Sequence, residues 1–366
     1  MAAPVKRIDD ILLECRAVWK VFGKKAPEAM RAIIDRGLNK REVLQKFDCV
    51  VGVAGATIQV HRGDIFCIMG LSGSGKSTLI RMLNRLIAPT SGEVLVKGRE
   101  VSRLNAAELR QMRAHDITMV FQSVALLPNR TVLENAAFGL EVQGVGKADR
   151  TLAAEASLKK VGLGDWMHRY PRELSGGMQQ RVGLARALTV NPEIILMDEP
   201  FSALDPLIRR QLQDEFRHLV KELGKSAVFI THDLDEAIRI GDRIAIMKDG
   251  VIIQDGTAEE IILNPADAYV EEFVSGISKL HLITARSVMI PMADFLAAWP
   301  EINLATLVMT TPDADMDELI DLSLTKDAPG ILVVENGMKI GVVTSRSLLL
   351  GVKGAKISGA VEPLVG

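Results

Sequence analysis

Residues 66–78 read Phe66-Cys67-Ile68-Met69-Gly70-Leu71-Ser72-Gly73-Ser74-Gly75-Lys76-Ser77-Thr78. The apolar residues 65–69 predict a buried strand, and residues 78–86 have a helical pattern. The turn between them fits G-x-x-x-x-G-K-[ST]. Glycine suits this turn because successive backbone N–H groups must curl around a phosphate, and a Cβ would obstruct that path. The stretch therefore predicts a phosphate-binding loop, to which the N-terminus of the helix adds partial positive charge.

Two side chains of this loop supply chemistry. Lys76 is placed to reach the β- and γ-phosphates of a nucleotide, and the Ser77 hydroxyl is placed to ligate Mg²⁺. The other predicted cradle residues are Ser72, Gly73, Ser74, Gly75 and Thr78. A chance glycine turn in a βα unit is the competing interpretation. The strand pattern before the turn and the helical pattern after it favour a nucleotide site.

The composition is that of an ordinary globular chain. Its 366 residues are 48% apolar and 25% charged, and the length suits one large and one small domain. The net charge of −2 gives no support to a nucleic-acid-binding surface. The three widely spaced cysteines form no metal or disulfide pattern, which fits a reducing compartment. Without a membrane-span pattern or a secretory signal, we expect a cytoplasmic chain that meets the membrane only through a partner.

The predicted fold class is α/β. Repeated βα units with short connections over residues 1–276 imply a mixed, mostly parallel sheet covered by helices. Two features interrupt this alternation. Residues 27–47 read as two short helices divided at Gly37, and about residues 123–173 read as an inserted helical subdomain. A small α+β domain is predicted at residues 277–366.

A pair of acids completes the phosphate site. The run Ile194-Ile195-Leu196-Met197-Asp198-Glu199 predicts a buried strand that ends in two carboxylates. Ligands of parallel sheets bind at the carboxyl ends of the strands. Asp198 is therefore placed to hold Mg²⁺ through water, and Glu199 to orient and activate an attacking water. Two acids at the start of a loop are the alternative, which the phosphate loop makes the weaker interpretation.

A second glycine-containing loop has the sequence Leu174-Ser175-Gly176-Gly177-Met178-Gln179-Gln180-Arg181. Ser175 and the two glycines precede a helix predicted to open at Met178, so this is another helix N-terminus suited to phosphate. One nucleotide does not need two such loops at different places. We therefore expect each loop to serve half of a shared site.

Taken together, these motifs resemble the nucleotide-binding subunit of an ABC transporter. The resemblance rests on the glycine-rich loop, Gln122, LSGGMQQ, ILMDEP, SALD and His232, and it covers about residues 8–276. It implies ATP and Mg²⁺ as cofactors and a head-to-tail dimer. In that dimer the phosphate loop of one copy faces the Ser175 loop of the other.

The resemblance also implies roles for single residues. Phe22 would stack on adenine, with the nearby Trp19 as its competitor, and Gln122 would link Mg²⁺ and the attacking water to the helical subdomain. His232 would contact the γ-phosphate and organise Glu199. The residues that would reach the partner's nucleotide or cross between the copies are Ser175, Gly176, Gly177, Gln179 and Asp205.

A finer resemblance concerns the transported solute. The insertion at residues 27–47, IMGLSGSGKSTLIRMLNRLIAPTSG and SALDPLIRRQLQDE resemble importers of glycine betaine, proline and related compatible solutes. Two alternative interpretations remain: an importer of choline or trimethylamine N-oxide, and a soluble ABC ATPase that takes no part in transport. A small-molecule kinase has no use for LSGGMQQ or His232. The resemblance implies transmembrane permease subunits, a periplasmic or lipid-anchored binding protein, and attachment at the cytoplasmic face of the inner membrane.

The C-terminal region has a different character. Residues 330–337 and 341–345 resemble one CBS module, and residues 278–300 resemble only a weak remnant of another. This implies a regulatory domain that responds to a nucleotide or to anionic lipid. The basic residues Lys339, Arg346, Lys353 and Lys356 outnumber the single acid Glu362 over residues 337–366. This excess favours an ordinary solvated face over a lipid-binding surface.

Overall fold

The computed structural model describes residues 10–275, 283–325 and 330–353 of the chain. The chain divides into two compact units, residues 1–255 and 256–366. The boundary predicted after Gly276 lies outside the described residues. Within the described ranges, no helix is both long enough and apolar enough to span a bilayer.

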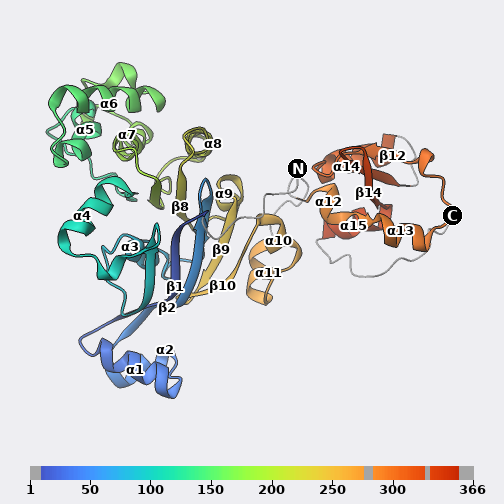
Figure 1. Cartoon of the computed structure of the whole chain (residues 1–366), viewed down its shortest axis with the longest axis horizontal. Helices are drawn as coiled ribbons and strands as arrows, with labels where there is room; N and C mark the ends of the chain where they lie inside the picture. The colour runs from blue at the N-terminus through green and yellow to red at the C-terminus, as the bar shows by residue number, and fades with distance from the viewer. Residues whose placement is uncertain (1–9, 276–282, 326–329, 354–366) are drawn as a thin grey trace. The chain divides into compact units, whose positions relative to one another are not determined.

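A six-stranded sheet forms the centre of the first unit (Figure 1). Its strand order is β10-β9-β3-β8-β7-β6, and the adjacent pairs from β9 to β6 are parallel. The strands are β3 (Ile65–Met69), β6 (Ile117–Val120), β7 (Ile194–Asp198), β8 (Ser226–Thr231), β9 (Arg243–Lys248) and β10 (Val251–Gly256). The prediction of a mixed, mostly parallel sheet is confirmed. Because β3 and β7 are both parallel to β8, the strand between them, the loops that follow them open at the same edge.

Helices precede or follow these strands along the chain. Among them are α3 (Lys76–Leu83), α4 (Ala106–His115), α8 (Pro206–Glu222) and α9 (Leu234–Ile240). The helix predicted at residues 78–86 is α3, which starts earlier because Gly75, with φ of 104°, turns the loop directly into the helix. Asp205 caps α8, with Pro206 in its first turn.

The remaining strands of the first unit form a separate antiparallel sheet, β2-β1-β4-β5, which the sequence did not distinguish from the parallel one. These strands are β1 (Ile11–Phe22), β2 (Val50–His61), β4 (Ser91–Val96) and β5 (Arg99–Glu100), followed by the 3₁₀ turn Val101–Arg103. Its buried residues pack with the parallel strands and α3 in one hydrophobic core that includes Leu13, Ile58 and Ile68.

The predicted insertion between β1 and β2 is confirmed as two helices, α1 (Ala26–Arg36) and α2 (Lys40–Phe47). Gly37 ends α1 with a φ of 65°, and Asn39 caps α2. Ala29, Met30 and Val43 pack against Val21 and Val51 in a small core of their own. The insertion is therefore an ordered part of the antiparallel sheet.

The predicted helical subdomain is built from α5 (Val132–Val142), α6 (Lys147–Lys160) and the 3₁₀ turns Gly164–Trp166 and Pro171–Glu173. It packs on α7 (Gly176–Thr189). In Figure 1 these green helices lie at the opposite end of the first unit from α1 and α2.

The second unit has its own four-stranded sheet, β11-β14-β13-β12, in which β12 is parallel to β13 and the other pairs are antiparallel. Its elements are α10 (Ala258–Leu263), α11 (Ala268–Val274), α12 (Ala285–Val288), β11 (Ile290–Pro291), α13 (Met292–Ala298), the 3₁₀ turn Leu304–Thr306, β12 (Val308–Thr310), α14 (Met316–Thr325), β13 (Ile331–Glu335), β14 (Met338–Val343) and α15 (Ser345–Lys353). The β12-α14-β13-β14-α15 part has the predicted β-α-β-β-α order.

Candidate functional site

The phosphate loop needs glycine at two of its positions. A Cβ on Gly70 would lie 2.1 Å from the Met247 carbonyl oxygen, and one on Gly75 would lie 2.3 Å from the Gly52 carbonyl oxygen. Both glycines also have positive φ angles, 151° and 104°. The Gly250 N–H, in the turn between β9 and β10, donates to the Ser74 carbonyl of the loop at 2.7 Å. The loop is thus fixed by backbone packing against β2 and the β9–β10 turn.

Lys76 lies inside the loop and is only 4% exposed. Its Nζ donates to the carbonyl oxygens of Gly70 at 2.7 Å and Leu71 at 3.0 Å, and it lies 3.9 Å from Glu199 Oε1. Burial lowers the pKa of this ammonium group, and the nearby carboxylates of Glu199 and Asp198 oppose that shift. A buried cation in a glycine-rich loop at the N-terminus of a helix is suited to binding a polyanion.

Ser77 and Asp198 meet as predicted from their motifs. The Ser77 hydroxyl donates to Asp198 Oδ1 at 2.8 Å, and Arg81 Nη2 donates to Asp198 Oδ2 at 3.0 Å. Asp198 ends β7 and is 2% exposed. A hydroxyl oxygen beside a carboxylate oxygen fits Mg²⁺, which prefers oxygen ligands.

Glu199 follows Asp198 with a φ of 46°, in the left-handed region that non-glycine residues rarely adopt. Such strained backbone is concentrated at functional sites. Glu199 Oε2 lies 3.3 Å from His232 Nδ1, where β8 has just ended. The two side chains predicted to act on the attacking water are therefore in contact.

Gln122 reaches the same region from the end of β6. Its Nε2 donates to Ser202 Oγ at 3.3 Å, and Ser202 Oγ donates to the Glu199 carbonyl at 3.0 Å. Gln180 on α7 donates to the Gln122 carbonyl at 3.4 Å. Gln122 thus joins the loop after β7 to α7, on which the helical subdomain packs.

The second glycine loop is a capped helix N-terminus. Ser175 Oγ accepts from the Met178 N–H, so α7 begins at Gly176, two residues before the predicted start. Gly177 lies under Ile208 of α8, where a Cβ would lie 2.9 Å from Cγ2. Gln179 Nε2 donates to the carbonyls of Pro171 and Leu174 at 3.1 and 3.3 Å. Ser175 itself is exposed.

The two glycine loops stay apart within one chain. Across the described residues, no hydrogen bond or ion pair joins residues 70–78 to residues 175–179, and Figure 1 shows α3 and α7 well separated. Gly176 instead lies against Leu204, in the loop that leads to Asp205. The structure therefore gathers the predicted residues into two clusters. One surrounds Lys76, and the other surrounds Ser175.

The two candidate adenine-stacking residues have different surroundings. Phe22 is 40% exposed, lies against Gly52 and carries Lys20 Nζ 5.1 Å from its ring centroid. Trp19 packs against the core of the insertion helices. Of the two, Phe22 has the larger exposed fraction.

Three functional contacts were missed from the sequence. Arg81 reaches Asp198, Ser202 bridges Gln122 to Glu199, and Gly250 holds the phosphate loop from behind. Arg81 is four residues after Ser77, so helical spacing was a usable signal for the first contact. The Ser202 and Gly250 contacts join loops that are far apart in the sequence. No local sequence pattern indicates such contacts.

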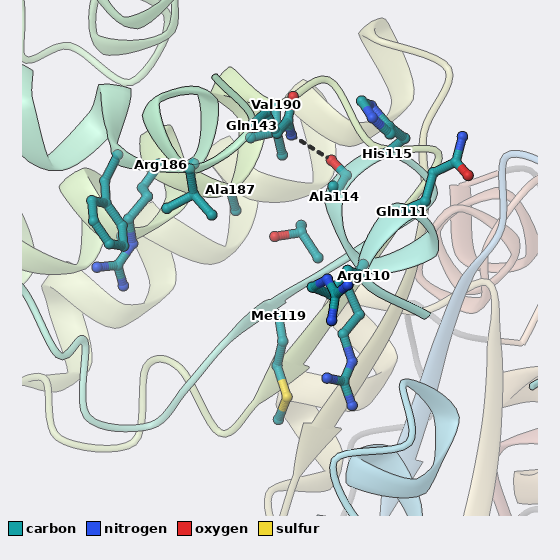
Figure 2. Close-up of a pocket in the computed structure, with 15 residues that line it drawn as sticks. Arg110, Gln111, Ala114, His115, Met119, Gln143, Arg186, Ala187 and Val190 are labelled. Atoms are coloured by element: carbon teal, nitrogen blue, oxygen red, sulfur yellow. Dashed lines mark hydrogen bonds between the residues drawn. The ribbon is translucent and has the colours of Figure 1, made fainter. Parts of the chain in front are cut away.

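A cavity of about 590 Å³ lies between α4 and β6 on one side and α5 and α7 on the other (Figure 2). Its walls include Arg110, Met119, Phe138, Gln143, Arg186 and Val190. Gln143 Nε2 donates to the Ala114 carbonyl at 2.7 Å, and Arg186 donates to the Val124 and Ala125 carbonyls. The loop at residues 124–125 therefore borders this cavity through Arg186 without lining it.

Known proteins share this sequence and fold. The family described as "ABC transporter" matches residues 53–202. The chain is 53% identical to the glycine betaine transport ATP-binding protein OpuAA of Bacillus subtilis, over 76% of this chain and 66% of that protein. It is 45% identical to the glycine betaine/proline betaine transport system ATP-binding protein ProV of Salmonella typhimurium, over 97% of this chain and 87% of the relative.

Two further similarities bear on solute and assembly. The chain is 42% identical to the trimethylamine N-oxide transport system ATP-binding protein TmoW of Pelagibacter ubique, over 92% of this chain and 96% of the relative. A solved dimeric ATP-binding cassette, in a post-hydrolysis state bound to ADP and Pi, matches with a TM-score of 0.56 and 31% identity. That match covers 67% of this chain and 98% of the solved one.

Proposed function

The chain belongs to the ATP-binding subunits of ABC transporters, and from this premise we propose that two copies of it close around two ATP molecules to drive solute uptake. It is an ATPase, the ATP-binding subunit of an importer of the glycine betaine and proline betaine type. One observation carries the proposal of closure. The loop that holds Lys76 and the loop that holds Ser175 do not touch within the described chain, although both are suited to phosphate.

The nucleotide is proposed to lie along the phosphate loop. Phe22 would stack on adenine, because it is the more exposed residue of the two candidates. Ser72, Gly73, Ser74, Gly75 and Thr78 complete the cradle around Lys76 and Ser77. The buried Lys76 ammonium would exchange its two loop carbonyls for phosphate oxygens, which are stronger acceptors because they are charged.

The proposed metal ligands are Ser77, Gln122 and, through water, Asp198. The close approach of the Ser77 hydroxyl to Asp198 Oδ1 supports this choice, because Mg²⁺ prefers oxygen ligands. When bound, Mg²⁺ neutralises charge that develops on the phosphates. Gln122 donates to Ser202, which in turn donates to the carbonyl of Glu199, the residue after Asp198. The Gln122 amide would therefore connect the metal ligands to the helical subdomain.

Glu199 and His232 are proposed to act on the attacking water. The Glu199 carboxylate would orient the water and accept its proton. His232 Nδ1, 3.3 Å from Glu199 Oε2, would hold that carboxylate in place. In the closed pair, Ser175, Gly176, Gly177 and Gln179 of the partner copy would cover the γ-phosphate. Asp205, which caps α8, would lie in the interface between the two copies.

The membrane permease is proposed to dock at the cavity between α4 and the helical subdomain. One wall of the cavity comes from α4 and β6, and the other comes from α5 and α7. A permease helix bound there would therefore be displaced when these two walls move relative to each other. Arg110 and Arg186 give the cavity a basic rim suited to an acidic residue on that helix. Through the permease the chain would sit at the cytoplasmic face of the inner membrane. A periplasmic or lipid-anchored binding protein would deliver the solute from the other side.

The second unit, residues 256–366, is proposed to regulate transport. Its β12-α14-β13-β14-α15 order and its own hydrophobic core support a single CBS-like module. We place the functional boundary near Gly276, after α11. Lys356 lies outside the described residues, so the lipid interpretation rests on the sequence alone.

The solute assignment is tested by reconstitution. The chain is combined with its permease and binding protein in proteoliposomes, and ATP hydrolysis is measured with glycine betaine, proline betaine, choline or trimethylamine N-oxide. We expect the betaines to stimulate hydrolysis most. Trimethylamine N-oxide is the second candidate because of the TmoW similarity. Proteoliposomes without the binding protein are the control, and hydrolysis that no solute changes would contradict coupling.

A further inference from the structure

One side chain of the nucleotide site has no role so far. Arg81 lies on α3 one helical turn after Ser77, so the two side chains leave the same face of the helix. Both reach Asp198. Ser77 Oγ donates to Oδ1 at 2.8 Å and Arg81 Nη2 donates to Oδ2 at 3.0 Å. A neutral donor and a cation thus divide the two oxygens of one carboxylate between them.

Asp198 depends on this cation. The carboxylate is 2% exposed, and a buried carboxylate is costly unless a counter-charge accompanies it. Lys76 does not serve this purpose, because its Nζ donates to two loop carbonyls and its nearest carboxylate is that of Glu199. In the part of the chain that the structure describes, Arg81 makes the single ion pair to Asp198.

The contact is also easy to release. Only one nitrogen of Arg81 bonds to Asp198, and its Nε is buried without a hydrogen-bond partner among the described residues. The side chain is 43% exposed, so the guanidinium has a path to solvent. An arginine in a two-pronged, fully satisfied pair would be much harder to displace.

We propose that Arg81 competes with the divalent cation for Asp198 and thereby sets the metal affinity of the nucleotide site. The proposal rests on the metal ligands proposed above. Two cations drawn to one small carboxylate repel each other, so each weakens the binding of the other. Arg81 keeps Asp198 paired and correctly oriented while no metal is bound, and metal binding releases it.

The test is a titration with Mn²⁺, a paramagnetic substitute for Mg²⁺, followed by electron paramagnetic resonance on the full-length chain in the presence of ADP. Arg81→Met removes the charge and keeps the aliphatic stem. We expect it to bind Mn²⁺ about tenfold more tightly, within the roughly 5- to 150-fold range of coupled sites. Arg81→Gln, which keeps a neutral donor, should tighten binding in the same direction. Arg81→Lys should stay near wild type.

Arg85 provides a matched control. It lies four residues further along the chain, just after α3 ends, and its Nη1 donates to the carbonyls of Val101 and Leu104 at 2.8 and 2.7 Å. Arg85→Met therefore removes a similar half-buried arginine contact without touching Asp198, and its Mn²⁺ affinity should not change.

Two results would overturn the proposal. If Arg81→Met and Arg81→Gln fold and bind ADP but bind Mn²⁺ no more tightly than wild type, Arg81 is only a structural partner of Asp198. If Asp198→Asn and Ser77→Ala leave Mn²⁺ binding unchanged, the metal is bound elsewhere, and both the proposed ligands and this competition are wrong. The first result leaves the proposed ligands intact, so the two failures are distinguishable.

Discussion

Lys76→Met separates the binding role of this lysine from its structural role. The ammonium group is 4% exposed and donates to the carbonyls of Gly70 and Leu71. Methionine keeps the aliphatic stem and removes the charge. Because burial lowers the pKa of Lys76, the fold already disfavours the charged form. Folding stability should therefore change little, or even rise, when the charge is removed.

Nucleotide binding should respond quite differently. Hydrogen bonds to charged groups contribute about 1.5–3 kcal/mol each. Lys76 has two carbonyl acceptors that phosphate oxygens would replace, so its loss should cost about 3 kcal/mol or more. That corresponds to at least roughly a 100-fold rise in Kd.

The assay is isothermal titration with ATP, paired with urea unfolding of the same samples. Lys97→Met is the control, since Lys97 pairs with Asp116 and Glu193 and does not contact the loop. We expect a large rise in Kd for Lys76→Met alone, with unfolding free energy near wild type. Tight ATP binding by Lys76→Met would refute the assigned role. Loss of binding together with loss of the fold would show that the lysine is structural.

Three further predictions concern other parts of the chain. Gly75→Ala should abolish ATP binding in equilibrium dialysis, because the added Cβ would lie 2.3 Å from the Gly52 carbonyl oxygen. Normal ATP binding by this variant would show that the loop can shift to accommodate the Cβ. Burial raises the pKa of Glu236 above its ordinary value of 4.5, so wild type should lose stability relative to Glu236→Gln as pH rises above 4.5 in urea melts, whereas a constant difference would mean that the folded pKa is not raised. Truncation after Gly276 should leave ATP hydrolysis intact and alter its response to ionic strength in proteoliposomes, and an unchanged response would dismiss the regulatory proposal.

Much of the fold was predictable because its signals are local. The apolar run at residues 65–69 became β3, and Gly37 divided the insertion into α1 and α2 as the pattern indicates. The assignment of strands to sheets was not predictable. Residues of β1, β2 and β4 read simply as strands, and only long-range pairing places them in a separate antiparallel sheet.

The candidate site divides in the same way. Lys76, Ser77 and Asp198 follow from spacing, because a turn between strand and helix and a carboxylate at a strand end are local features. The Gln122–Ser202–Glu199 connection and the support of Ser74 by Gly250 depend on loops far apart in the sequence. No pattern in a single segment could predict them.

The central claim is that the nucleotide site is completed by a second copy of the chain. Glu199→Gln offers the most direct test, because it keeps the side-chain shape and removes the proposed proton acceptor, so ATP should bind without being hydrolysed. Light scattering on the purified variant with ATP and Mg²⁺ should give the mass of two chains, and Glu199→Gln combined with Ser175→Arg should return to one. A Glu199→Gln chain that binds ATP and stays a single chain at every concentration would contradict the account.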